Sequence, residues 1–69
     1  MDEETLNINI RKFLKKLGIR SQREIEQAIM TAVDRGKLIG NEKLVASAHI
    51  TLEGTEMDLT LSEEISLTE

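Results

Sequence analysis

The chain has 69 residues, no cysteine, one histidine and a formal net charge of −4. This length is enough for one domain at most. The lack of cysteine excludes disulfides, and one histidine without any thiol argues against a structural metal site, so we expect no metal and no cofactor. Domains this small often gain stability from a partner subunit, which leaves self-association open.

The N-terminal residues indicate where the protein is located. Met1 to Glu4 are acidic, whereas a signal peptide opens with basic residues and then an apolar run. No stretch approaches the 18 consecutive apolar residues that a membrane-spanning helix needs. We therefore expect a cytoplasmic protein with no membrane partner.

A first helix is predicted over residues 2–17. Asp2 suits the N-cap and Gly18 suits the left-handed position that ends many helices. Between them, apolar residues recur at helical spacing along one face: Leu6, Ile10, Phe13, Leu14 and Leu17.

A second helix is predicted over residues 21–35. Ser21 and Glu24 form a capping box at its start, and Gly36 suits its end. Its apolar stripe consists of Ile25, Ala28, Ile29, Ala32 and Val33. Because only Gly18, Ile19 and Arg20 would link the two helices, we expect an αα-hairpin.

From Leu44 onwards the apolar residues alternate with polar ones, which is typical of strands. Strands over 44–53 and 56–67, joined by a two-residue type II′ turn at Gly54 and Thr55, would form a β-hairpin. In this register apolar residues face each other in four pairs: Leu52 with Met57, Ile50 with Leu59, Ala48 with Leu61, and Leu44 with Ile65.

Glu63 is the exception, because it falls opposite Ala46 on the apolar face. Either the second strand breaks there, leaving a short third strand over 65–67, or Glu63 lies at the rim of the sheet. In both cases the expected fold class is α+β, of order ααββ: a two-helix hairpin packed on a C-terminal antiparallel β-hairpin, with the helical stripes covering the sheet's apolar face.

The chain also resembles a family of small bacterial proteins of about seventy residues that is a domain of unknown function. The stretches that carry the resemblance are Asp2–Ile8, Arg11–Lys16, Ser21–Glu26 and Gly40–Leu44. The resemblance covers the first two thirds of the chain well and the hairpin only by pattern. It implies a bacterial source but no activity, cofactor or site.

The basic residues cluster in one segment that contains no acidic residue. They are Arg11, Lys12, Lys15, Lys16, Arg20 and Arg23. Residues 1–43 carry a formal charge of +2 and residues 44–69 carry −6. The cluster is a candidate anion or partner-binding face, with Arg20 and Arg23 flanking the predicted N-terminus of the second helix. The alternatives are a solvated helix face, or a face that meets the acidic hairpin of another copy.

A polar loop supplies a second candidate contact patch. It consists of Gly40, Asn41, Glu42 and Lys43, although these residues can also simply turn the chain into the first strand. His49 is predicted to point away from the apolar face, across from Thr60 and diagonal to Asp58, as a surface histidine. A His–carboxylate pair can carry acid–base chemistry, but no nucleophile motif accompanies it.

The sequence therefore predicts no enzyme, with a small enzyme or an accessory subunit of one as the third hypothesis. We expect a non-enzymatic protein-interaction or structural module that forms a homodimer, with an unidentified protein partner as a further possibility. The alternative is a nucleic-acid-binding, winged-helix-like domain that uses the Arg11–Arg23 face. Negative net charge and the absence of aromatic residues for stacking argue against nucleic acid.

Overall fold

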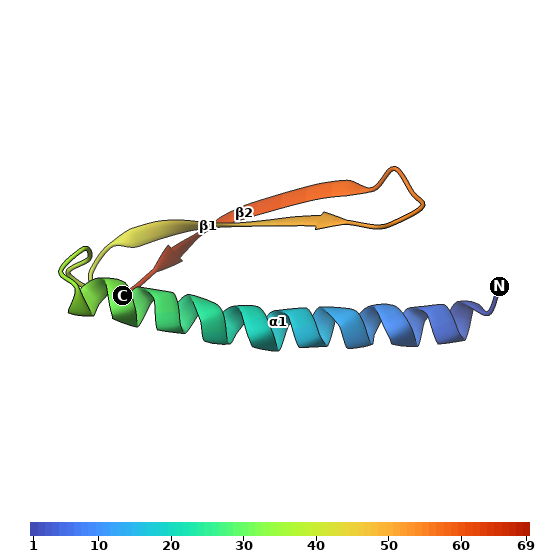
Figure 1. Ribbon diagram of the computed structural model, residues 1–69, viewed down its shortest axis with the longest axis horizontal. Coiled ribbons are helices and arrows are strands. Elements are labelled where there is room, and N and C mark those ends of the chain that lie inside the picture. Colours follow the sequence, from blue (N-terminus) through green and yellow to red (C-terminus); the bar gives the residue numbers. More distant parts are fainter. The chain divides into compact units, whose positions relative to one another are not determined.

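The computed structural model describes all residues, 1–69, and contains one helix and one β-hairpin (Figure 1). Helix α1 spans Glu3–Asp34, strand β1 spans Lys43–Thr51 and strand β2 spans Asp58–Ser66. The chain divides into two compact units, Met1–Lys37 and Leu38–Glu69. The mixture of helix and sheet agrees with the α+β prediction, but the ααββ order is wrong.

The two predicted helices are one continuous helix. Gly18, expected to end the first helix, is absent from the glycines with positive φ, so it does not take the left-handed conformation of a C′ residue. Ser21, expected to cap the second helix, lies in the interior of α1. The αα-hairpin is therefore not formed.

Continuity of α1 has a clear physical reason. Ending one helix at Gly18 and starting another at Ser21 would leave several backbone N–H and C=O groups without helical partners. Glycine in a helix interior costs only about 1 kcal/mol relative to alanine. The apolar positions also stay in phase across the proposed break, since Leu17, Ser21 and Ile25 follow one another at intervals of one turn.

Both ends of α1 have the predicted caps. At the start, the Asp2 carboxylate accepts hydrogen bonds from the backbone N–H groups of Glu4 (3.0 Å) and Thr5 (3.1 Å). At the end, Gly36 has φ +74°, its N–H donates to Val33, and the N–H of Lys37 donates to Ala32. These two bonds form a Schellman motif, which explains why the helix stops here and not at Gly18.

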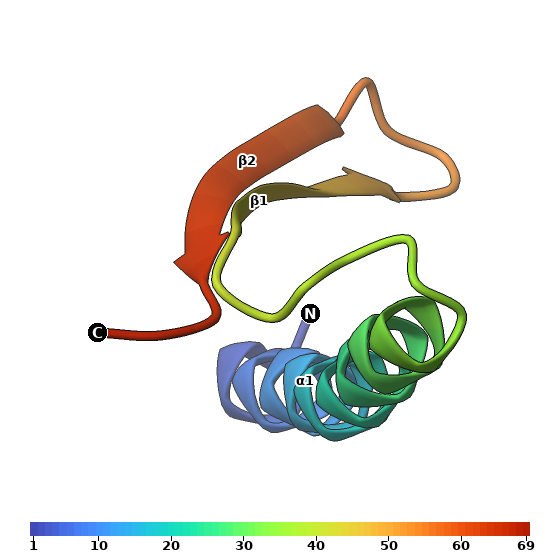
Figure 2. The ribbon, with the colours of Figure 1, turned by 90° about the vertical axis from the view of Figure 1, so that its left-hand side faces the viewer.

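The β-hairpin has the predicted register. Leu44 pairs with Ile65, Ala48 with Leu61 and Ile50 with Leu59 in one antiparallel ladder. The two strands twist and curve together (Figure 2). One apolar row from each strand therefore lies on the same face of the sheet, as the alternation indicated.

The tip of the hairpin differs from the prediction. The ladder stops at Thr51 and Asp58, so Leu52 and Met57 lie in the connection and do not pair. Thr55 donates its backbone N–H to the Leu52 carbonyl (3.2 Å), which makes Glu53 and Gly54 the central residues of the turn. Gly54 has φ +81° at the third turn position, where a type II turn needs glycine.

Of the two alternatives for Glu63, the strand break is absent. Glu63 pairs with Ala46 inside an unbroken ladder, and β2 continues to Ser66. The side chain of Glu63 is exposed. There is therefore no third strand, and the carboxylate in the apolar row keeps its contact with water.

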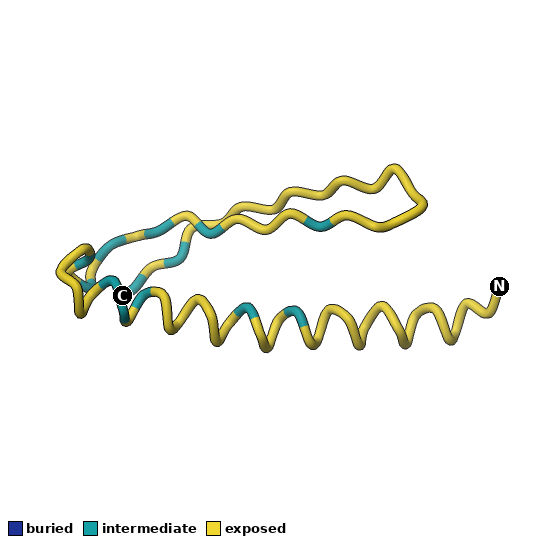
Figure 3. The backbone as a smooth tube through the Cα atoms, in the orientation of Figure 1, coloured by how far each residue is buried: buried dark blue, intermediate teal, exposed yellow.

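No residue of the chain is buried (Figure 3). The most covered residues reach only an intermediate class; among them are Leu17 and Ile29 in α1, and Leu44, Ile50 and Ile65 in the hairpin. Neither unit therefore has a buried core of its own. Large apolar side chains of both units face solvent.

Candidate interaction surface

The six basic residues of the predicted binding face all lie on α1 and are all exposed. None of them forms an ion pair with a carboxylate. From Arg11 to Arg23 the helix rises about 18 Å, and the six side chains spread over about half of its circumference. We define this surface as the basic face of α1.

The helix N-terminus predicted beside Arg20 and Arg23, whose free N–H groups would favour an anion, is absent. Both residues lie in the interior of α1, where the backbone N–H groups are bonded within the helix. What remains at this position is side-chain charge alone.

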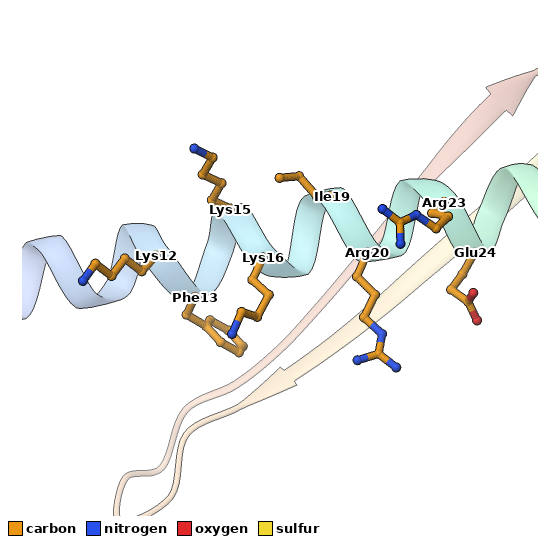
Figure 4. A pocket seen from close by; sticks show the side chains of 8 residues that line it. All are labelled: Lys12, Phe13, Lys15, Lys16, Ile19, Arg20, Arg23 and Glu24. Carbon is orange, nitrogen blue, oxygen red and sulfur yellow. The ribbon is translucent and has the colours of Figure 1, made fainter.

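A shallow surface groove runs along this part of α1 (Figure 4). Its lining consists of five of the six basic residues together with Phe13, Ile19 and Glu24. In Figure 4, Lys15 and Ile19 project from one side of the helix, whereas Lys16 and Arg20 project from the other. The groove therefore does not gather charged groups around one point, as a small-molecule site would.

An apolar stripe runs along the whole of α1 on the side opposite the basic face. Eight positions, separated by three or four residues, fall within about 100° of the helix circumference. They are Leu6, Ile10, Leu14, Leu17, Ser21, Ile25, Ala28 and Ala32. Leu6, Ile10, Leu14 and Ile25 keep 43%, 48%, 49% and 37% of their surface exposed. We call this surface the α1 stripe.

The polar face of the hairpin carries two cross-strand side-chain pairs. The hydroxyls of Ser47 and Ser62 lie 2.9 Å apart, and His49 Nε2 lies 2.5 Å from Asp58 Oδ1. The position of His49 agrees with the prediction, since it is opposite Thr60 and 60% exposed. The serine pair was missed, although the predicted register already placed the two serines opposite each other.

These pairs do not make a catalytic arrangement. Ser47, His49 and Asp58 share a face, but the Ser47 hydroxyl is bonded to Ser62 and not to the imidazole. His49 and Asp58 are both well exposed, so no water-excluded environment surrounds them. A nucleophile hydrogen-bonded to its base, which acyl transfer requires, is therefore missing here.

The polar loop patch has an internal structural role. The Glu42 carboxylate accepts hydrogen bonds from the backbone N–H groups of Ile39 (2.8 Å) and Gly40 (2.9 Å). The bond from Ile39 holds the pKa of Glu42 below its usual value. Gly40 has φ +103°, which supports the reading of this loop as a turn into β1. Asn41 remains exposed, and Lys43 is the first residue of β1.

Metal sites and membrane spans are two further features that could carry a function. No group of three or more His, Cys, Asp or Glu side chains is arranged to hold a metal ion. α1, the one helix, lacks the long apolar stretch required to cross a membrane. The surfaces left as candidates are the basic face, the α1 stripe and the apolar face of the hairpin.

Comparison with known proteins identifies the family. A family model described as "Family of unknown function (DUF6494)" matches residues 1–68. The chain belongs to this family. The resemblance to a family of unknown function is thereby confirmed. No curated protein and no solved structure matches the chain.

Proposed function

We propose that this member of the family is a cytoplasmic, non-enzymatic interaction or structural module that self-associates. The observation that supports this proposal is the exposure of both apolar faces. No side chain is buried, while the α1 stripe and the hairpin face carry large aliphatic residues. Contiguous apolar patches of this kind on a soluble protein mark interaction surfaces.

Each unit needs a cover for its apolar face. An isolated two-stranded hairpin is at best marginally stable in water. A helix outside a protein context also gains little stability from propensity alone, because most helical stability in proteins comes from packing. A second copy of the chain offers identical apolar faces and can supply the missing cover.

The free energy gained by burying the α1 stripe determines the concentration range in which self-association must be measured. Leu6, Ile10, Leu14 and Ile25 are each a little under half exposed. Burying the exposed part gains about 1 kcal/mol per side chain, or about 8 kcal/mol for two copies. Association costs about 4–15 kcal/mol in lost freedom. The stripes alone therefore predict a weak dimer, which additional contacts from the hairpins would strengthen.

The test is the solution mass by light scattering over about 1 μM to 1 mM, a range that spans weak dissociation constants. A mass that rises from one chain, 7.8 kDa, to two supports the proposal. A mass of one chain at every concentration overturns it, since the chain would then cover its own apolar faces.

Nucleic-acid binding is the second candidate. It is favoured by one observation: six exposed basic side chains on one helix segment, none in an ion pair. The winged-helix form of this idea is wrong, because α1 contains no helix-turn-helix. The basic face of α1 would instead contact phosphates. Such binding must weaken steeply as salt rises, so lack of binding to mixed DNA or RNA at low salt would exclude it.

A further inference from the structure

The continuity of α1 gives the α1 stripe a direction. Its N-terminal half carries large side chains: Leu6, Ile10, Leu14 and Leu17. Its C-terminal half carries Ser21, Ala28 and Ala32, with Ile25 as the one large residue. A helix with two separate stripes, as the sequence alone suggested, would not show this asymmetry.

The asymmetry favours one orientation when two copies of the stripe meet. In a parallel pair, large residues would face large ones at one end and alanine would face alanine at the other. Two helices packed at an even distance need large side chains opposite small ones. An antiparallel pair meets this need, because Leu6 then lies opposite Ala32 and Ile10 opposite Ala28.

The basic face of α1 points away from the seam between the two stripes, because its six residues are centred on the side of the helix opposite the α1 stripe. The basic residues therefore stay exposed in either orientation, and side-chain size alone selects the antiparallel one.

We propose that two copies of the chain pair antiparallel through the α1 stripe, crossing between Leu17 and Ser21. This inference rests on the proposed function, since it specifies the surface through which the module self-associates. The partner it assigns to the stripe is a second copy of the same helix.

Disulfide trapping tests the orientation, because the chain has no cysteine of its own. The variants Ile10→Cys and Ala28→Cys are mixed and mildly oxidised, and the products are identified by intact mass. In the antiparallel pair Ile10 and Ala28 of different copies are level, so the mixed disulfide is expected. The two Ala28 residues are about 27 Å apart along the axis, which exceeds the Cα separation of under about 7 Å that a disulfide allows.

A matched control uses Ile8→Cys mixed with Met30→Cys. These two residues would also be level in the antiparallel pair, but they lie on the side of α1 away from the stripe, and both are exposed. We expect no mixed disulfide between them. Equal cross-linking in the control and in the test pair would mean random collision and would overturn the inference.

The outcomes separate this inference from the proposed function. A dimer by mass together with the mixed Ile10–Ala28 disulfide supports both. If the Ala28→Cys variant instead cross-links with itself and the mixture does not, the helices are parallel and the inference is wrong. A dimer without any of these disulfides also overturns the inference, since another surface then joins the copies. A chain that stays monomeric removes the proposed function itself.

Discussion

Replacing Gly18 with alanine should stabilise the protein. Gly18 lies in the interior of α1 without a positive φ, and an added Cβ would meet no heavy atom of the chain within 4 Å. The substitution therefore removes the flexibility of glycine without a clash. The expected gain is about 0.8–1.0 kcal/mol, which corresponds to a rise in Tm of about 4–8 °C for a domain of this size.

The matched control is Gly36→Ala. A Cβ at Gly36 also meets nothing within 4 Å, but Gly36 has φ +74° and closes the Schellman motif. Alanine there must take the left-handed conformation, which costs about 1–2 kcal/mol. The two variants thus make the same chemical change with opposite expected signs.

Thermal and urea unfolding followed by far-UV circular dichroism measure both variants. The assay should run at low protein concentration, so that a partner helix does not contribute to the environment of Gly18. If Gly18→Ala destabilises the protein about as much as Gly36→Ala, then Gly18 is a left-handed helix end. In that case the reasoning for one continuous helix fails.

Three further predictions concern the stripe, the helix cap and the hairpin pair. Leu14→Lys should weaken self-association at least tenfold in sedimentation equilibrium, because an unpaired charge would be buried; Ile19→Lys, on the opposite side of α1 and similarly exposed, should not. The hydrogen bond from the Thr5 N–H lowers the pKa of Asp2 below 3.8, so its contribution to helix stability is complete above that value and is lost as pH falls through the folded-state pKa. An acid titration of helix content that matches the Asp2→Ala variant at every pH would contradict this. His49→Ala should change the free energy of unfolding by under about 1 kcal/mol, since the pair with Asp58 is exposed; a larger loss in urea unfolding would show an unrecognised role.

The features that the sequence predicted correctly are those with short-range causes. Asp2 caps a helix because its own carboxylate reaches the next N–H groups, and Gly36 ends the helix through its local conformation. The hairpin register followed from strict alternation, in which a slip of one residue would expose every apolar side chain. In each case a few neighbouring residues decide the outcome.

The helix break was wrong because two local signals outweighed a longer one. Gly18 resembles a C′ residue, and Ser21 with Glu24 resembles a capping box. Against them stood the phase of the apolar stripe, which passes through Leu17 and Ile25 without a shift only if the helix continues. The phase of an apolar stripe can be recognised only over several helical turns, whereas a cap motif can be recognised within four residues.

The wrong helix break also explains which part of the candidate site was mispredicted. The basic residues are exposed and unpaired, as a binding face requires, but the helix N-terminus expected beside Arg20 and Arg23 depended on the helix break and is absent. The asymmetry of the α1 stripe became visible only once the two helices proved to be one. Two short predicted stripes did not indicate a partner, because the hydrophobic effect is non-directional and either stripe could pack on any apolar surface.

The separation of charge along the chain offers a competing way to self-associate, and salt distinguishes the two. The basic face of α1 has no ion-pair partner, and residues 44–69 carry six acidic and no basic side chains. If the basic face of one copy met the acidic hairpin of another, the contact would be exposed and would weaken as the Debye length falls from about 10 Å at 0.1 M salt to about 3 Å at 1 M. Apolar burial along the α1 stripe does not weaken under these conditions. We therefore expect the dimer to persist at 1 M salt, and a dimer seen only at low salt would assign the contact to the charges.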